Sequence, residues 1–178
     1  MKTPLALVTL ALLTAALFAP TLAAQKASSG AVRFNTAFEG AALGRIEVVA
    51  ETEFRVHVPG QQDQRGRNRQ ATWYYFRMDN VRGRSLTLTL TNFLPGEYND
   101  KPSAHMNAEP RPVYSHDGEH WQHVSEMAWD DKLKEGKFTL RAETDSLWLA
   151  LVQPYTHSRV VRLLGEIAKS PHARVETV

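Results

Sequence analysis

The chain has 178 residues, no cysteine, and a formal net charge of +2 from 21 basic and 19 acidic side chains. This near balance of charge excludes a strong electrostatic field for binding nucleic acid or an anionic membrane. Without cysteine the chain has no disulfide, no thiolate metal site and no lipid-modified N-terminal cysteine, so its core must hold the fold together. The length fits one domain, or one domain plus a removable leader.

Residues 1–24 have the three parts of a secretory signal peptide. Lys2 gives a positive start, residues 5–18 form an apolar stretch, and small residues up to Ala24 offer a cleavage site. A retained membrane anchor and a buried helix are the alternatives, but the apolar stretch is short for a membrane span and Pro20 interrupts it. We therefore expect export through a cleaved signal peptide to a periplasmic or secreted location, with no stable membrane anchor afterwards.

After a polar linker (residues 25–33), hydrophobic residues repeat with period two. In residues 86–91, for example, leucine alternates with threonine, which predicts a half-buried strand with a solvated threonine face. We expect strands at residues 45–50, 53–58, 72–79, 86–91, 111–115, 119–124, 137–142 and 147–152. Gly-, Pro- and Asn-rich turns separate them and crossover helices are absent. The sequence therefore predicts an all-β fold, an antiparallel, jelly-roll-like β-sandwich over residues 34–157.

One helix is expected after the last strand, over residues 158–170. Ser158 is its expected N-cap and Pro171 ends it. Its apolar face comprises Val160, Val161, Leu163, Leu164 and Ile167. Because the helix follows the sandwich at its C-terminal end, we expect a connector to a further domain, with residues 171–178 beginning the linker to it.

The segment from Ser115 to Trp121 raises the question of a metal site. His116 and Glu119 form His-x-x-Glu, the spacing from which zinc carboxypeptidases draw two of their three protein ligands, and His120 and His123 stand close behind. A catalytic zinc site needs three converging ligands, an open position for water and supporting hydrogen bonds.

The same segment also carries a strong turn signal. Asp117-Gly118 between strand-like segments is typical of a two-residue hairpin turn. Such a turn places His116 opposite Glu119, Ser115 opposite His120, and Tyr114 opposite Trp121. His116 and His120 would then lie on opposite faces, although His105 could approach from another loop. We favour the turn and assign no metal site to His116 and Glu119.

Other candidate sites are weaker. The aromatic run of residues 73–76 could line a ligand-binding face, but alternation sends half of its rings into the core whatever the function. Arg65, Arg67 and Arg69 could contact an acidic partner, although a solvated loop is the simpler interpretation. No serine lies in a nucleophile elbow and the glycines are scattered, so no catalytic or cofactor-binding residue is assigned.

Four segments, in this order, resemble the N-terminal accessory domain of cytosolic-carboxypeptidase-like zinc carboxypeptidases. They are Phe38-Glu39-Gly40; Trp73-Tyr74-Tyr75-Phe76-Arg77 with Asn80; Tyr114-Ser115-His116-Asp117-Gly118-Glu119-His120-Trp121; and Pro154-Tyr155-Thr156 before a helix. The resemblance spans residues 34–171. It implies a β-sandwich packed beside a zinc peptidase domain. It also marks candidates for the domain interface, Pro154-Tyr155-Thr156 above all; the others are Trp73, Tyr74, Tyr75, Phe76, Arg77, Asn80, Tyr114, Asp117, Gly118 and Trp121.

The resemblance also implies a function. In the family the domain after the helix binds zinc, and this chain stops about where that domain would begin. We therefore expect a non-catalytic domain that buttresses the catalytic domain of an exported zinc carboxypeptidase and shapes its substrate cleft. The expected partners are that domain in cis and the parent's peptide substrate, with zinc bound there and no cofactor in this chain. Stand-alone binding of glycan or peptide is the alternative, and a small metalloenzyme using the histidines is a third hypothesis.

Overall fold

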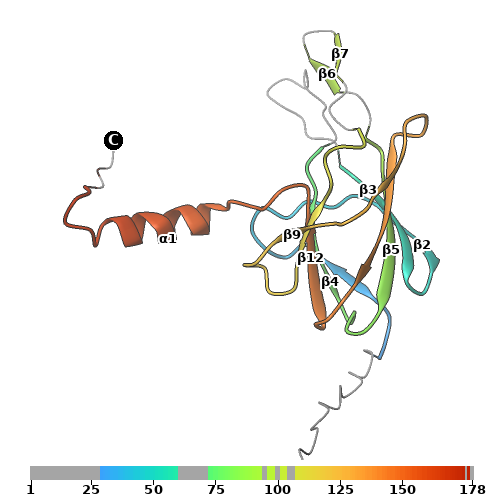
Figure 1. Ribbon diagram of the computed structural model, residues 1–178, viewed down its shortest axis with the longest axis horizontal. Helices are drawn as coiled ribbons and strands as arrows, with labels where there is room; N and C mark the ends of the chain where they lie inside the picture. The colour runs from blue at the N-terminus through green and yellow to red at the C-terminus, as the bar shows by residue number, and fades with distance from the viewer. Residues whose placement is uncertain are drawn as a thin grey trace, which may run out of the picture.

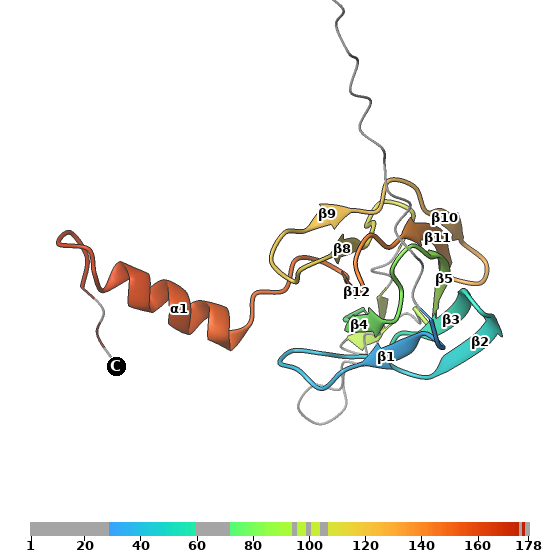
Figure 2. The same cartoon turned by 90° about the horizontal axis from the view of Figure 1, so that it is seen from below.

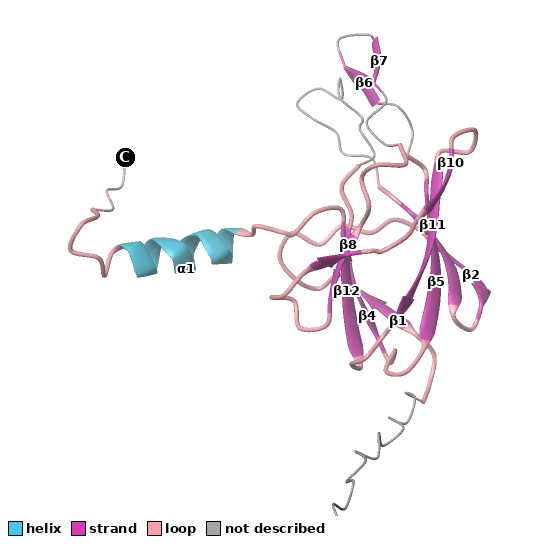
Figure 3. Ribbon diagram, viewed as in Figure 1, coloured by secondary structure: helices cyan, strands magenta, loops and turns pink. Residues whose placement is uncertain are grey.

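The computed structural model describes residues 29–59, 72–93, 96–98, 101–103, 107–174 and 176. The expected leader, the loop with Arg65, Arg67 and Arg69, and His105 lie outside these residues. Within them, two five-stranded sheets pack as a sandwich and one helix follows (Figures 1 and 3). No helix in the described part of the chain is long and apolar enough to cross a membrane.

The first sheet is antiparallel throughout, with strand order β1-β4-β12-β8-β9. Its strands are β1 (Arg33–Asn35), β4 (Tyr75–Asp79), β12 (Ser146–Ala150), β8 (Val113–Ser115) and β9 (Gln122–His123). β4 and β12 lie at the centre, and Tyr75 pairs with Ala150 across them. This sheet carries the candidate functional site on its outer face.

The second sheet has strand order β10-β11-β5-β3-β2. Its strands are β10 (Ala128–Asp130), β11 (Glu135–Arg141), β5 (Ser85–Thr91), β3 (Glu53–His57) and β2 (Ile46–Ala50). β3 and β5 run parallel, whereas the other neighbours are antiparallel. A separate small hairpin joins β6 (Gly96–Tyr98) and β7 (Lys101–Ser103).

The core lies between the two sheets and follows the period-two pattern of the sequence. Its inward residues include Phe54, Val56, Phe76, Met78, Leu86, Leu88, Leu90, Phe138, Leu140, Leu147 and Leu149, all buried. Full burial of each such side chain stabilises the fold by about 1.5–3 kcal/mol relative to exposure. The threonines of β5 differ from expectation, because Thr89 and Thr91 are buried and only Thr87 is partly exposed.

The predicted all-β sandwich with one C-terminal helix is therefore confirmed, with the parallel pairing of β3 and β5 as a difference within it. Strands β1, β6, β7 and β10 were not expected from the sequence, because they are short and lack a clear alternation. The expected strand over residues 119–124 is reduced to β9, since the residues before it form a loop.

The helix α1 (His157–Ile167) projects away from the sandwich (Figure 2). It begins one position before the expected start, and Thr156 rather than Ser158 is its N-cap. The Thr156 side chain makes no capping hydrogen bond. A backbone N–H group of the first turn, that of Ser158, instead donates to the side chain of Glu39, far away in the sequence.

Candidate functional site

An aromatic cluster covers the outer face of the first sheet. Tyr75 of β4 is its centre, and the ring centroids of Phe38, Trp121 and Trp73 lie 4.9, 5.9 and 6.3 Å from it in edge-on contacts. Tyr75 is only 7% exposed. The rings pack on one another, which favours a structural role over the ligand-binding face considered from the sequence.

The run of residues 73–76 is therefore covered on both of its faces, with Tyr74, Tyr75 and Phe76 buried and Trp73 partly buried. Tyr74 and Phe76 point into the core, whereas Trp73 and Tyr75 belong to the outer cluster. The prediction of cover on both sides is confirmed, but the strand is shorter than the expected residues 72–79, because β4 begins at Tyr75. Burial raises the pKa of the Tyr75 hydroxyl, the nearby Arg159 opposes this rise, and Glu119 adds to it.

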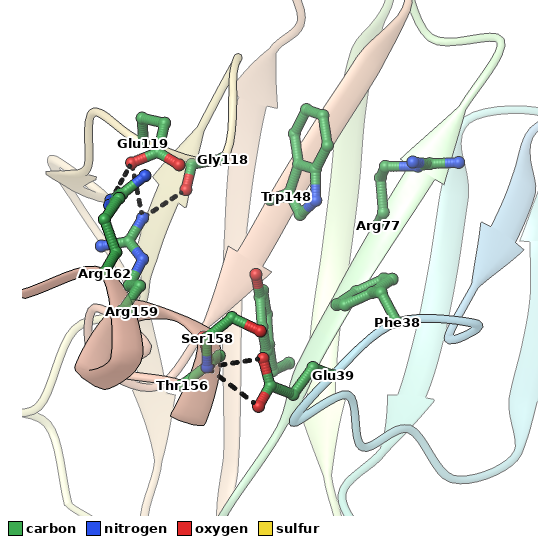
Figure 4. Close-up of a pocket in the computed structure, with 11 residues that line it drawn as sticks. Phe38, Glu39, Arg77, Gly118, Glu119, Trp148, Thr156, Ser158, Arg159 and Arg162 are labelled. Carbon is green, nitrogen blue, oxygen red and sulfur yellow. Dashed lines mark hydrogen bonds and ion pairs between the residues drawn. The ribbon is translucent and has the colours of Figure 1, made fainter. Parts of the chain in front are cut away.

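A pocket of about 350 Å³ opens beside this cluster, at the base of α1 (Figure 4). Its lining comes from each of the segments singled out in the sequence, and from the helix. The lining residues are Phe38, Glu39, Tyr75, Arg77, Gly118, Glu119, Trp148, Thr156, Ser158, Arg159 and Arg162. Segments far apart in the sequence thus meet at the junction between the sandwich and α1.

The Arg77 side chain, which lines this pocket, is held in place by Asp79. Its Nη2 donates to Oδ2 of Asp79 at 3.0 Å, and its guanidinium carbon lies 5.4 Å from the centre of the Trp148 ring. The Ser146 hydroxyl donates to Oδ1 of Asp79 at 2.7 Å. Burial acts to raise the pKa of Asp79, but these hydrogen bonds outweigh burial and hold the pKa below its usual value.

The Asp117-Gly118 turn is not the two-residue hairpin that the sequence predicts. Tyr114 pairs with Gln122 rather than Trp121, so residues 116–121 form a longer loop. Gly118 has φ of 77°, a left-handed conformation that suits glycine. The loop is longer because side chains, rather than strand pairing, satisfy its backbone N–H groups.

Two side chains bind these N–H groups. The Ser115 hydroxyl accepts from the N–H of Gly118 at 2.8 Å, and Oδ1 of Asp117 accepts from the N–H groups of Glu119 and His120, both at 2.8 Å. Oδ2 of Asp117 lies 2.7 Å from Nδ1 of His120. Local bonding of this kind is typical of aspartate in turns.

The same bonds shift two pKa values. The N–H and the imidazole of His120, with the N–H of Glu119, lower the pKa of Asp117 far below its usual range. The hydrogen bond and the negative charge of Asp117 raise the pKa of His120. Both side chains are exposed, so the shifts come from this local contact and not from burial.

His116 and Glu119 do not converge on a common point. The Thr144 hydroxyl lies 3.4 Å from Nδ1 of His116 and donates to the His116 carbonyl at 3.2 Å, whereas Glu119 turns toward the helix. Within the described ranges, no group of three or more His, Cys, Asp or Glu side chains is arranged to hold a metal ion.

Two carboxylates instead fix the base of the helix, and we call them the helix clamp: Glu39 and Glu119. Oε2 of Glu119 accepts from Nη2 of Arg159 at 3.1 Å and from Nη2 of Arg162 at 3.3 Å. The carbonyl of Gly118 accepts from the same Arg159 nitrogen at 2.8 Å (Figure 4).

Glu39 binds the helix N-terminus. Its two carboxylate oxygens accept from the N–H of Ser158 at 3.3 and 3.2 Å. A carboxylate at this position satisfies a free N–H and complements the positive end of the helix dipole. Hydrogen bonding to Ser158 is the main cause that lowers the pKa of Glu39.

The other residues that the family resemblance marks lie outside the lining of this pocket. Asn80 has φ of 64° and its side chain donates to the carbonyl of Ala31 at 3.0 Å, away from the pocket. Pro154 is buried, whereas Tyr155 is 63% exposed. The ring of Tyr114 lies 5.7 Å from the ring of His116.

Sequence reasoning missed the roles of Trp148, Glu39 and the helix arginines. Arg159 and Arg162 are three positions apart on one helix face, which signals a shared partner, but nothing in the sequence identifies Glu119 as that partner. Trp148 lies in an expected strand, and its outward position follows from alternation alone.

Comparison with known protein families gives one match. The model of the cytosolic carboxypeptidase N-terminal domain matches residues 34–151, which cover both sheets and stop before α1. No curated protein matches the chain.

Solved bacterial structures share the fold. A metallo-carboxypeptidase from Burkholderia cenocepacia matches with a TM-score of 0.60 at 21% identity, covering 80% of this chain and 34% of that one. A putative carboxypeptidase from Burkholderia mallei matches with a TM-score of 0.61 at 23% identity, covering 86% and 36%. A metallo-carboxypeptidase from Pseudomonas aeruginosa matches with a TM-score of 0.54 at 22% identity, covering 76% and 33%. The chain thus spans about a third of the length of these structures.

Proposed function

Because the chain belongs to the cytosolic carboxypeptidase N-terminal domain family, we propose that it is the non-catalytic N-terminal domain of an exported zinc carboxypeptidase. The domain buttresses a catalytic domain that follows it and shapes one rim of the substrate cleft. The parent protein removes C-terminal residues from peptides, and zinc in the catalytic domain activates the attacking water.

The observation that carries this proposal is the convergence of the family segments at the base of α1. Phe38-Glu39, Tyr75 with Arg77, Gly118-Glu119 and Thr156 all line one pocket there. Core packing alone does not require such separate segments to meet on an outer face at the exit of the chain. Their convergence is expected if these segments form a junction with another domain.

Tyr155 supports the choice of docking face. It is a large side chain, 63% exposed, between the buried Pro154 and the N-cap Thr156. Exposed aromatic residues beside a structured pocket are frequent anchors of interfaces. We assign Pro154-Tyr155-Thr156 to the contact with the catalytic domain.

The activity is tested on the natural reading frame, cloned from the leader through Val178 to its stop codon. We expect the product to contain zinc and to release single C-terminal residues from N-terminally blocked peptides, and we expect a chelator to abolish this activity. A frame that encodes no further zinc-binding domain, or a product without peptidase activity, overturns the proposal.

The docking role is tested in the same protein with Tyr155→Ala. We expect a loss of kcat/KM or of thermal stability that Leu133→Ala does not cause, because Leu133 is a similarly exposed apolar residue in the turn between β10 and β11 of the second sheet. Equal behaviour of the two variants argues against a docking role for Tyr155.

Export is part of the same proposal and rests on the first 24 residues. Fractionation of cells that produce the chain, followed by N-terminal sequencing, tests it. We expect a mature N-terminus after Ala23 or Ala24 in the exported fraction. A chain retained in the cytoplasm with Lys2 still present contradicts export.

A further inference from the structure

Helix α1 carries an apolar stripe that has no partner in the described part of the chain. Val160, Leu163, Leu164 and Ile167 have the i, i+3, i+4, i+7 spacing of one helix face. No residue of α1 is buried, and Leu163 and Leu164 are 48% and 41% exposed. Among the described elements, α1 packs against no strand.

A helix of this kind is poorly stable on its own. It has 11 residues, which is below the length at which isolated helices become stable in water. Gly165 and the β-branched Val160 and Val161 lower its helix propensity further. Glu39 and Glu119 hold only its first two turns, so the rest of its stability must come from packing of the stripe against another surface.

The helix clamp determines which way the stripe faces. Arg159 and Arg162 lie one turn apart on the polar side of α1, and both are bound to Glu119. Because residues advance by about 100° around a helix, the centre of the stripe lies about 120° around the axis from these arginines. Leu163 is the stripe residue nearest to them, and it lines a surface hollow with Arg159 and Arg162. Most of the stripe therefore faces a different side of the helix from the contact with Glu119.

The charged side chains beside the stripe are mostly paired within the chain. Arg159 and Arg162 share the one carboxylate of Glu119, which leaves one positive charge in excess, and Lys169 binds Glu166 at 2.8 Å. The stripe itself carries no charge, so a partner that covers it must offer an apolar surface there.

We propose that this stripe is buried against the domain that follows in the same polypeptide, and that the helix clamp sets the direction in which that domain is held. The choice of occupant rests on the proposed function. It is supported by the position of α1 just after the matched family region, which ends at residue 151, and by the related structures, of which this chain covers only 33–36%. In this arrangement α1 is shared by both domains.

Hydrogen–deuterium exchange tests the proposal on two purified proteins, the chain ending at Val178 and the complete product of its reading frame. In the shorter protein we expect the amides of the second half of α1, residues 163–167, to exchange almost as fast as unstructured ones, because the helix clamp holds only residues 158–162. In the complete product we expect exchange slowed by at least about 100-fold, as in packed helices. Leu163→Gln with Leu164→Gln should return α1 to fast exchange there, because glutamine keeps helix propensity but removes the apolar stripe.

Gly165→Ala is the matched control, since a Cβ at Gly165 meets nothing within 4 Å. It should not reduce the protection of α1 in the complete product. Slow exchange of α1 already in the shorter protein overturns the proposal. If that protection rises with concentration alongside dimerisation in sedimentation, the occupant is a second copy. A reading frame that ends at Val178 also overturns the proposal.

The same sample separates this inference from the proposed function. A complete product that is an active zinc peptidase but leaves α1 unprotected contradicts the docking of α1 alone. A complete product that protects α1 but shows neither zinc nor peptidase activity contradicts the carboxypeptidase function and leaves the docking surface standing.

Discussion

Glu119, in the loop between β8 and β9, accepts a hydrogen bond from Arg159 in the first turn of α1, across 40 residues of sequence. The same glutamate is half of the His-x-x-Glu spacing that resembles a zinc site. Its carboxylate is directed toward two arginines, and His116 is bound near Thr144 instead. The loop therefore fixes the start of a helix.

The first prediction compares the two arginines of this contact. Arg159 is 16% exposed and binds both Glu119 and the Gly118 carbonyl, whereas Arg162 is 63% exposed and binds Glu119 alone. We expect Arg159→Ala to lower the free energy of unfolding by about 1 kcal/mol, the usual contribution of one net hydrogen bond. Arg162→Ala should cost no more than about 0.5 kcal/mol, as for exposed ion pairs. Urea denaturation measures both, and equal losses contradict the clamp as described.

The second prediction concerns Gly118. Its φ is 77°, and a Cβ there would lie 3.6 Å from the Trp148 ring. We expect Gly118→Ala to destabilise the domain by about 1–2 kcal/mol, because the left-handed conformation is costly for residues with a side chain. Thermal unfolding followed by tryptophan fluorescence is the measurement, and an unchanged midpoint contradicts the expectation.

Gly165→Ala provides the opposite case within the same chain. Gly165 lies in α1 and has open space around it. The substitution should raise the helical signal in circular dichroism, since alanine is favoured in a helix by about 1 kcal/mol. It should leave the sandwich transition unchanged, because α1 packs against none of the described strands.

The third prediction concerns zinc. The chain ending at Val178, purified without a tag and dialysed, should hold far less than one equivalent of zinc by elemental analysis, because no described residues form a ligand group. His116→Ala should leave that content unchanged. A stoichiometric ion that disappears in this variant would restore the metal interpretation of the His116–Glu119 spacing.

The fold could be predicted because period-two alternation directly reflects a buried and an outer face. Leu86, Leu88 and Leu90 show this plainly, and all three are in the core. The parallel pairing of β3 with β5 could not be predicted, since the strands are separated in sequence and alternation carries no information on strand direction. Cover on both sides of the aromatic segment was predicted correctly, because rings at successive positions point to both faces, although the strand begins only at Tyr75.

The candidate site could be predicted only in part. The family segments are visible in the sequence, and the structure brings one or more residues of each to the pocket. The contacts that organise it join residues far apart, such as Glu39 to Ser158 across 119 positions, and local spacing cannot reveal them. The predicted hairpin and the predicted N-cap at Ser158 were wrong for related reasons: Asp117 bonds the loop backbone, and a distant glutamate binds the helix end.

The fourth prediction concerns the ionisation of His120. Its pKa is raised because the ring bonds to Asp117, so Asp117→Asn should return the pKa toward about 6.5, the value of an unperturbed histidine. The asparagine oxygen can still accept from the backbone N–H groups, so the loop should persist. Asp131→Asn is the control, because Asp131 bonds Lys134 and not His120. Nuclear magnetic resonance titration of His120 in the three proteins measures the effect, and an unchanged pKa in Asp117→Asn contradicts it.

The last prediction concerns how stability depends on pH through the same pair. The pKa of Asp117 is lowered in the folded chain, so its contribution is present above the unfolded value of about 3.9 and is lost as the pH falls through the folded value. The pKa of His120 is raised, so its contribution is complete below about 6.5 and is lost as the pH rises through the folded value. The difference in unfolding free energy between the natural chain and Asp117→Asn should therefore be largest between about pH 4 and 6.5 and shrink on either side. Urea denaturation across this range measures the difference, and a flat profile would show that the two side chains do not titrate as a pair.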